Sequence, residues 1–297
     1  MTRSGFVGLA GRPNVGKSTL ANAIVGAKVS IVSERPQTTR RAIRGIATEP
    51  AGEWQMVLVD LPGVQRPRDS LTARMQRRVQ QELAAADAAL LVVDGAQGIG
   101  PGDRFIAKAL LAGADGIPVA CAVNKCDRLT PAETAAALAG AAELEAVDEV
   151  FPVSAKSGDG LGALVGHLAS LLPEGPPLYP PEGRSDLPSD VHVAELIREQ
   201  VLRRTRDEVP HAVEVYVDSI EPRDDGLVEV HAQVWAETES QKAILVGKGG
   251  RMVREIGTAA RKELERDLDA RVFLDLLVKV RPRWRRDDTL LDRIGID

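Results

Sequence analysis

The chain has 297 residues, of which 44% are hydrophobic and 27% are charged, and its formal net charge is -5. This length allows two domains with hydrophobic cores of their own, and no apolar run is long enough to span a membrane as a helix. The two cysteines, Cys121 and Cys126, lack the number and spacing of a structural metal site, so we expect cytosolic thiols. The sequence enters its first predicted strand almost at once, and we therefore expect no signal or transit segment.

Residues 11–18 read Gly-Arg-Pro-Asn-Val-Gly-Lys-Ser and stand between an apolar run, residues 5–10, and a helix-like stretch, residues 19–25. A strand, a glycine-rich loop and a helix in this order predict a phosphate-binding loop. We expect Lys17 to reach the β- and γ-phosphates of a nucleotide and the Ser18 hydroxyl to bind Mg²⁺. The alternative is a glycine-rich turn without a ligand. The predicted nucleotide contacts of this loop are Gly11, Arg12, Pro13, Asn14, Val15, Gly16, Lys17, Ser18 and Thr19.

A Thr-Thr-Arg sequence at residues 38–40 lies between the loop helix and the predicted strand at residues 55–60. A mobile loop at this place would bring a threonine to Mg²⁺. We prefer Thr39 to Thr38 for this role. The alternative is that both are ordinary loop hydroxyls.

An Asp-Leu-Pro-Gly sequence, residues 60–63, follows the strand-like residues 55–59. Asp60 stands where a second carboxylate associated with Mg²⁺ belongs, usually through water, and the Gly63 N–H is placed to sense the γ-phosphate. The predicted metal-site residues are therefore Ser18, Thr39 and Asp60. Further predicted nucleotide contacts are Asp60, Leu61, Pro62, Gly63 and Val64.

An Asn-Lys-Cys-Asp sequence at residues 124–127 indicates which base is bound, because it follows a buried strand-like run, residues 117–123. The Asp127 carboxylate can accept hydrogen bonds from the N1–H and the exocyclic amine of guanine. Adenine has no such donor pair and would leave the carboxylate unpaired. A solvated turn is the alternative for this short motif. The predicted base contacts are Asn124, Lys125, Cys126 and Asp127, with Ser154, Ala155 and Lys156 from a further loop.

These motifs, in this order, resemble the GTPases related to translation factors. From about residue 5 to about residue 296 the chain is similar to the Era family of bacterial ribosome-assembly GTPases. The residues that carry this similarity are 11–20, 36–40, 60–63, 124–127, 154–158, 197–199, 208–211 and 247–250. One departure is Leu61, where the family usually has threonine. We expect Mg²⁺ binding to survive it, with an altered water network.

The resemblance implies phosphoryl transfer from GTP to water, with Lys17, Asn14, Thr39 and Gly63 as the catalytic residues. Val64 follows Gly63, so no glutamine is present there to orient the attacking water, and we expect slow intrinsic hydrolysis. Related GTPases with an asparagine at the position of Asn14 and a Thr-Thr-Arg loop use K⁺ in place of an arginine finger. K⁺ is therefore a hypothesis here, and the alternative is that Asn14 only makes hydrogen bonds within the loop.

Strand-like and helical runs alternate over residues 1–172, which predicts a doubly wound α/β sheet. The expected strands are residues 5–10, 55–60, 89–94, 119–124 and 149–153, with an edge strand near 42–48 and a surface helix at 132–146. Six prolines then crowd residues 173–190, which predicts a semi-rigid, extended linker. We expect a second domain from residue 191 to residue 297.

The second domain shows a helix at 191–206, a hairpin of strands 212–220 and 227–235, helices at 240–246 and 251–267, and a strand at 271–280. A Gly-Lys-Gly-Gly sequence, residues 247–250, separates the last two helices. This order is that of an α+β KH domain of the bacterial type II arrangement, whose groove takes about four nucleotides. A GxxG sequence alone is weak, since it also forms simple helix-to-helix turns.

Charge supports the same interpretation, because residues 240–286 hold 13 Lys and Arg against 6 Asp and Glu, whereas residues 191–239 hold 5 against 12. A basic segment supplies phosphate affinity, although such runs are often only solvated faces. We propose Ile244, Val246, Val253 and Ile256 as groove wall or core, and Trp284 as a base-stacking or a tail-packing residue. The predicted RNA contacts are Lys242, Gly247, Lys248, Gly249, Gly250, Arg251 and Arg254.

The resemblance implies that the RNA is the 3′ end of small-subunit ribosomal RNA and that the role is maturation of the 30S subunit. The γ-phosphate of GTP would order residues 36–40 and 60–71, and GTP hydrolysis would release them. We expect a cytoplasmic monomer; the basic cluster at residues 281–286 supports only weak peripheral membrane contact. The alternatives are an RNA-binding scaffold with little turnover and a membrane-associated signalling GTPase. An RNA-modification GTPase would need a further domain for which the chain has no room.

Overall fold

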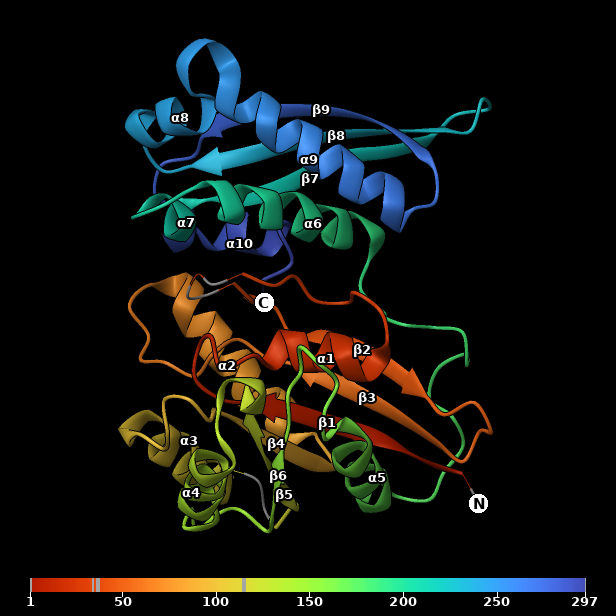
Figure 1. Ribbon diagram of the computed structural model, residues 1–297. Helices are drawn as coiled ribbons and strands as arrows, with labels where there is room; N and C mark the ends of the chain where they lie inside the picture. The colour runs from red at the N-terminus through yellow and green to blue at the C-terminus, as the bar shows by residue number, and fades with distance from the viewer. Residues whose placement is uncertain (1, 34, 36–37, 114–115, 297) are drawn as a thin grey trace. The chain divides into compact units, whose positions relative to one another are not determined.

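A computed structural model describes residues 2–33, 35, 38–113 and 116–296 of the chain (Figure 1). By its internal contacts the chain divides into two compact units. Unit 1 consists of Met1–Ser30, Thr39–Pro67 and Thr72–Asp186, and unit 2 of Ile31–Thr38, Arg68–Leu71 and Leu187–Asp297. Unit 2 thus includes two short segments from the first half of the chain in addition to the C-terminal region.

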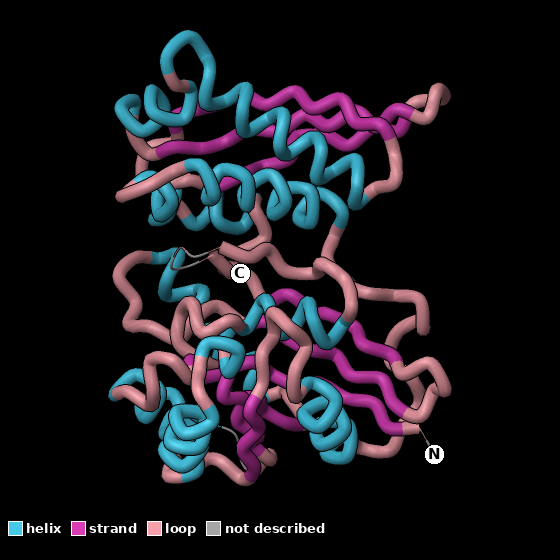
Figure 2. The backbone as a smooth tube through the Cα atoms, in the orientation of Figure 1, coloured by secondary structure: helices cyan, strands magenta, loops and turns pink. Residues whose placement is uncertain are grey.

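Unit 1 contains a six-stranded sheet in the order β2-β3-β1-β4-β5-β6, in which only β2 is antiparallel to its neighbour (Figures 1 and 2). The direction of strand addition reverses between β1 and β4, and ligands of open α/β sheets bind outside the strand ends at such a point. The strands are β1 Arg3–Ala10, β2 Ile43–Thr48, β3 Trp54–Asp60, β4 Ala88–Asp94, β5 Val119–Asn124 and β6 Glu149–Pro152.

Helices cover both faces of this sheet, which explains why strands such as β4 are apolar at successive positions and buried throughout. Helices α1 and α5 share one core with alternate residues of β1, β3 and β4. Helices α3 and α4 share a second core on the other residues of β4 and β5. The elements are α1 Lys17–Val25, α2 Ser70–Ala84, α3 Pro101–Gly113, α4 Pro131–Ala142, α5 Leu161–Leu171 and the short η1 Cys126–Arg128.

The proline-rich segment predicted as a linker packs along unit 1 as far as Asp186. The Gln55 side chain donates to the carbonyl of Tyr179 at 2.9 Å and accepts from the N–H of Leu178 at 2.7 Å. The N–H of Ile46 donates to the carbonyl of Arg184 at 2.8 Å. These bonds hold an extended, proline-rich strand of chain that cannot form a helix of its own.

Unit 2 contains a three-stranded sheet in the order β7-β8-β9, with β7 antiparallel and β9 parallel to β8. Helices α6, α8 and α9 bury apolar residues against one face of it. The elements are α6 Ser189–Arg204, α7 Val209–Ala212, β7 Glu214–Pro222, β8 Leu227–Ala236, α8 Glu239–Val246, η2 Lys248–Gly250, α9 Arg251–Asp267, β9 Arg271–Val280, η3 Trp284–Arg286 and α10 Asp288–Arg293.

The order of α6, β7, β8, α8, α9 and β9 is the predicted KH order, and α9 and β9 have the predicted bounds. Two short helices, α7 and α10, were not predicted, because neither is long enough to show helical periodicity. The Asp287 side chain caps α10 by accepting from the N–H of Leu290 at 3.2 Å. No helix among the described residues is long and apolar enough to cross a membrane.

Candidate nucleotide-binding and RNA-binding sites

The predicted phosphate loop joins β1 to α1 at the point where the strand order reverses. Its Lys17 ammonium donates to the carbonyls of Gly11, at 3.0 Å, and Arg12, at 3.1 Å. Gly16 has a left-handed φ of 101°, and a Cβ there would lie 2.3 Å from the Asn124 amide nitrogen. A side chain at this glycine would therefore push the base-binding motif away from the loop.

Burial sets the protonation behaviour of Lys17. Removal from water lowers the pKa of its ammonium from 10.5 to about 8, although the nearby Asp60 carboxylate acts in the opposite direction. Burial raises the pKa of Asp60, and Lys17 and neighbouring hydroxyls only partly offset that rise. An anionic phosphate beside Lys17 would favour its charged form.

Three oxygen-bearing side chains meet beside this loop. The hydroxyls of Ser18 and Thr39 are 3.0 Å apart, and the Thr39 hydroxyl is 3.4 Å from Oδ2 of Asp60. Oδ1 of Asp60 is buried and has no hydrogen-bond partner among the described residues. A buried carboxylate oxygen without a partner beside two hydroxyls fits Mg²⁺, which prefers oxygen ligands and retains waters.

Thr38 does not share this arrangement. Its hydroxyl donates to the carbonyl of Arg35 at 2.6 Å, within unit 2, whereas Thr39 belongs to unit 1. The geometry thus favours Thr39, as preferred from the sequence. Pro36 and Gln37, part of the segment predicted to switch, lie outside the described residues.

The Asp-Leu-Pro-Gly segment contributes backbone more than side chains. Leu61 is fully buried and packs with Val59 and Val79, so its side chain points into the core. The expectation that Leu61 alters a water network at the nucleotide therefore lacks a structural basis. A Cβ on Gly63 would lie 2.8 Å from the ring of Pro13, so a glycine is needed for this close approach to the phosphate loop. Val64 is half-buried against the core of β4 and β5.

The Asn-Lys-Cys-Asp motif is tied to both of the other predicted loops. Asn124 donates to the carbonyl of Val15 at 2.9 Å and accepts from the N–H of Ala155 at 3.0 Å. The Ser154 hydroxyl donates to the Asp127 carboxylate at 2.8 Å, which leaves this exposed carboxylate oriented at the end of β5. Cys126 donates its thiol to the carbonyl of Val123 and so helps shape the turn. Lys156 is exposed.

The Gly-Lys-Gly-Gly turn joins α8 to α9 in left-handed backbone geometry. Gly249 and Gly250 have φ values of 61° and 77°. A Cβ on Gly247 would lie 2.8 Å from the Cβ of Met252. Only glycine accommodates these demands together, and the backbone stays open to close approach by a phosphate.

A groove of about 430 Å³ begins beside this turn and runs between α9 and β9. Its lining residues are Gly250, Val253, Arg254, Gly257, Thr258, Arg261, Phe273, Leu274 and Leu276. Gly250 and Arg254 are among the predicted RNA contacts. The others, Lys242, Gly247, Lys248, Gly249 and Arg251, do not line it, and the exposed Arg251 pairs with Glu255 at 2.8 Å.

Most of the residues that form the apolar wall of the groove were not predicted from the sequence. Val253 lines it, but Ile256 is buried in the core and Ile244 is exposed elsewhere on α8. The wall comes instead from β9, whose Phe273 is 49% exposed. No local sequence pattern marks these residues, because β9 supplies the wall only through its position beside α9.

Trp284 is a tail-packing residue and not a stacking platform. It is fully buried, and its indole N–H donates to the carbonyl of Ala212 at 2.9 Å. Buried tryptophan normally finds such a partner for its polar atom. The interpretation that Trp284 stacks on a base is therefore wrong.

Comparison with known families agrees with this architecture. Residues 6–125 match the family described as 50S ribosome-binding GTPase, and residues 208–285 match the KH domain family. The chain is therefore a GTPase whose nucleotide-binding fold precedes a KH domain.

Proteins that are similar to the chain over nearly its full length define its family more closely. The chain is 46% identical over 296 residues to GTPase Era of Mycobacterium tuberculosis, covering 98% of each chain. It is 45% identical to GTPase Era of Mycobacterium sp. strain KMS, covering 99% of this chain and 98% of that one. The chain belongs to the Era family of GTPases.

Two solved structures share the whole fold. Aquifex aeolicus Era, in a variant bound to GDP and AlF₄⁻, is 36% identical with a TM-score of 0.93 and covers 99% of each chain. Era in complex with MgGDPNP and nucleotides 1506–1542 of 16S ribosomal RNA is 35% identical with a TM-score of 0.95, covering 100% of this chain and 99% of that one.

Proposed function

We propose that this GTPase is a nucleotide-controlled switch that binds the 3′ end of small-subunit ribosomal RNA and assists maturation of the 30S subunit. The observation that carries the RNA half of the proposal is the groove that begins at the GxxG turn and combines Arg254 and Arg261 with the exposed Phe273. Cationic side chains and an aromatic face are the two components of single-stranded RNA binding. The solved Era complex with 16S ribosomal RNA supports the choice of RNA.

The nucleotide half of the proposal assigns roles to residues of unit 1. Backbone N–H groups of residues 11–18, apart from Pro13, would hold the phosphates. Lys17 would exchange its two carbonyl partners for the β- and γ-phosphates. Asp127 would accept from guanine, with Ser154 holding that carboxylate in place. The Gly63 N–H would report the presence of the γ-phosphate.

Ser18, Thr39 and Asp60 would hold Mg²⁺, directly or through water, and their fit rests on the unpartnered oxygen of Asp60. Mg²⁺ bound there would neutralise charge on the β- and γ-phosphates during attack by water. Asp60 and Lys17 are both buried, so their opposite charges are felt strongly in a site that excludes water. No glutamine follows Gly63, which is consistent with a slow intrinsic rate.

We also propose that K⁺ beside Asn14 accelerates hydrolysis. A monovalent cation there would neutralise charge between the phosphates, as an arginine finger does. The rate of GTP hydrolysis is then expected to be at least about tenfold higher in KCl than in NaCl at equal ionic strength. Asn14→Ala should remove this difference. Equal rates in the two salts would contradict this role.

The protein would act in the cytoplasm as a monomer, with residues 1–172, a linker at 173–190 and residues 191–297 as its working parts. Weak peripheral membrane contact through residues 281–286 is the second candidate behaviour, favoured only by their positive charge. Arg285 of that cluster already pairs with Asp69 at 2.7 Å within unit 2, which reduces the charge available to lipid.

The groove proposal predicts that Arg254→Ala weakens RNA binding about tenfold at physiological salt and lowers the salt dependence by about one counterion. Arg266→Ala is the matched control, because Arg266 is an exposed arginine on the same helix and does not line the groove. Binding of an oligonucleotide from the 3′ end of small-subunit ribosomal RNA, against a scrambled control, would be measured with a GTP analogue, with GDP and without nucleotide.

Selective binding that is stronger with the GTP analogue and is reduced only by Arg254→Ala would support the switch. Weak binding that ignores sequence, nucleotide and both variants would contradict it. A scaffold with little turnover would instead bind selectively without any response to nucleotide.

A further inference from the structure

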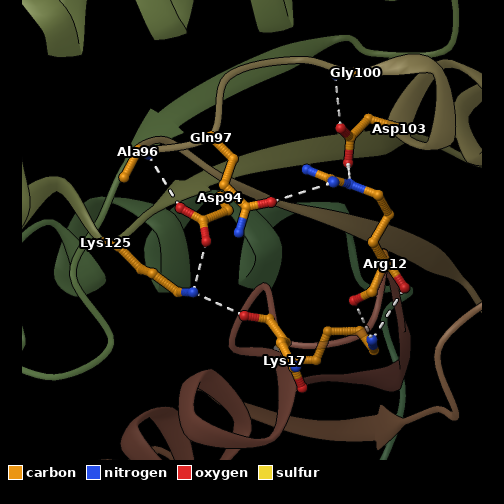
Figure 3. Close-up of polar contacts among 10 residues, drawn as sticks. Arg12, Lys17, Asp94, Ala96, Gln97, Gly100, Asp103 and Lys125 are labelled. Atoms are coloured by element: carbon orange, nitrogen blue, oxygen red, sulfur yellow. Dashed lines mark hydrogen bonds and ion pairs between the residues drawn. The ribbon is translucent and has the colours of Figure 1, made fainter. Parts of the chain in front are cut away.

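The end of β4 and the start of α3 present two buried carboxylates to the outer side of the phosphate loop, and no motif marks either of them. Asp94 is the last residue of β4, and Asp103 lies in the first turn of α3. Their exposed fractions are 2% and 0%. Buried carboxylates are rare unless they are paired, so each of these two is expected to have a bonding partner. Figure 3 shows that each one faces a cationic side chain of the nucleotide site.

Asp94 holds the lysine of the base-binding motif. Its Oδ2 is 2.6 Å from the Lys125 ammonium, which also donates to the carbonyl of Asn14 at 2.7 Å. Its Oδ1 accepts from the N–H of Ala96 at 3.0 Å, so the carboxylate is fixed before the lysine reaches it. Lys125 therefore spans from the end of β4 to the middle of the phosphate loop.

Both residues joined by the bond from the Lys125 ammonium to the Asn14 carbonyl have a strained backbone. Lys125 and Asn14 have left-handed φ values of 68° and 66°, a region that non-glycine residues enter at some energetic cost. Such conformations persist only when surrounding contacts enforce them. The Asp94–Lys125 pair, together with the bond to the carbonyl of Asn14, is a contact that does so at both positions.

Asp103 holds the arginine of the phosphate loop in the same way. Its Oδ1 is 2.8 Å from Nε of Arg12, and its Oδ2 accepts from the N–H of Gly100 at 2.9 Å. Gln97 adds a bond of 3.3 Å to the Arg12 guanidinium. A Cβ on Gly102, the second residue of α3, would lie 2.7 Å from Cδ of Arg12, so the glycine leaves room for the arginine side chain in this position.

We propose that Asp94 and Asp103 are positioning residues for the guanine nucleotide, which hold the phosphate loop from outside through Lys125 and Arg12. Neither carboxylate contacts the phosphates itself, since each is occupied by a cation and a backbone N–H. By fixing the loop before nucleotide arrives, they remove part of the ordering cost of binding and set how long the nucleotide stays. This inference rests on the proposed nucleotide site.

The test is the dissociation rate of fluorescent GDP from the full-length protein. Asp94→Asn is expected to increase this rate about tenfold, because the ion pair with Lys125 is replaced by a weaker bond from the ammonium to an uncharged amide oxygen. Lys125→Met is expected to increase it by a similar or larger factor. The double variant should match Lys125→Met alone, since Asp94 acts only through that lysine.

Asp87→Asn is the matched control, because Asp87 stands before the opposite end of β4 and accepts from the N–H of Phe6 at 2.8 Å. It should leave the dissociation rate unchanged. An unchanged rate in Asp94→Asn would overturn the proposal while leaving the nucleotide site standing. Additive effects in the double variant, or equal acceleration by Asp87→Asn, would also overturn it. Failure of the unmodified protein to bind GDP would overturn the nucleotide site itself.

Asp103→Asn tests the second arm in the same assay. It is expected to accelerate GDP dissociation severalfold, and the effect should disappear in an Arg12→Ala background. If Asp103→Asn accelerated GDP dissociation by the same factor with and without Arg12, Asp103 would only cap its own loop. That result would overturn the role proposed for Asp103.

Discussion

Replacing Lys17 with methionine is expected to abolish GTP binding and, at the same time, to make the nucleotide-free protein harder to unfold. The two effects have one origin, the burial of an ammonium group. Among the described residues, this ammonium donates to two carbonyl oxygens, those of Gly11 and Arg12. The polyphosphate it is placed to bind carries full negative charges.

The size of the stability effect follows from the pKa of Lys17. Lowering it from 10.5 to about 8 corresponds to roughly 3 kcal/mol of unfavourable free energy in the folded protein at pH 7. Methionine fills similar space without charge but leaves the carbonyl groups of Gly11 and Arg12, one buried and one partly buried, with one partner fewer. The net gain is therefore expected to be about 1–2 kcal/mol.

The pH dependence has a definite sign. The unfolded chain binds a proton at Lys17 up to about pH 10.5, whereas the folded protein releases it near pH 8, so the unmodified protein gains stability between these values. The advantage of Lys17→Met should therefore be largest below pH 8 and should shrink as pH rises towards 10. Lys108→Met, which removes an exposed lysine on α3, should show no such trend.

Urea unfolding of nucleotide-free protein at pH 7 and pH 9.5, with fluorescent GTP binding on the same samples, would check both effects. Affinity for GTP is expected to fall by at least about a thousandfold, since a charge-assisted bond to the phosphates is lost and the others depend on its placement. A variant that binds GTP normally, or one that is less stable at pH 7, would contradict this account of Lys17.

Local patterns predicted most of the strands and the nucleotide loops because their signals are contiguous in sequence. The phosphate loop, for example, is a run of eight residues whose backbone conformation depends on glycines within it. The KH order could likewise be predicted, since α9 and β9 are long enough to show their own periodicity. The register of the strands and the tertiary contacts of individual side chains could not be predicted in this way.

What could not be predicted depends on contacts between residues that are distant in sequence. Asp103 meets Arg12 across 91 positions, and Asp94 meets Lys125 across 31, so neither carboxylate differs locally from a solvated one. The same limit applies to the wall of the RNA groove, which β9 supplies only because it is an edge strand beside α9. The assignment of Ile31–Thr38 and Arg68–Leu71 to unit 2 is likewise not marked by any local pattern.

Arg198→Met is expected to destabilise unit 2 by about 3–5 kcal/mol, because it removes the cation from a buried cluster of carboxylates. Arg198 is 0% exposed, and its guanidinium binds both oxygens of Glu195 and lies 3.5 Å from Glu214. Burial alone would lower the pKa of the guanidinium, but these carboxylates raise it above its ordinary value, so the group stays charged. Arg198 also donates to the carbonyl of Thr38, within the same unit.

The matched control is Arg203→Met on the same helix. Arg203 pairs with Glu199 at 3.1 Å, but its own side chain is half exposed, so solvent replaces much of what is lost. The expected cost is below about 1 kcal/mol. Tryptophan emission during urea unfolding would report the difference, since Trp235 and Trp284 are both buried in unit 2. A Trp54→Phe background removes the third tryptophan, which belongs to unit 1.

A second set of substitutions can distinguish two causes of the lost stability, namely the lost hydrogen bonds of Arg198 and the buried carboxylates that remain without a cation. If the cost of Arg198→Met comes mainly from carboxylates left buried without a cation, adding Glu195→Gln and Glu214→Gln should recover a large part of it, because these two side chains then carry no charge to desolvate. If the cost came from the hydrogen bonds of the guanidinium themselves, the triple variant would be no more stable than the single one. Recovery of more than about half of the lost stability would establish that Arg198 is required chiefly because its neighbours are charged.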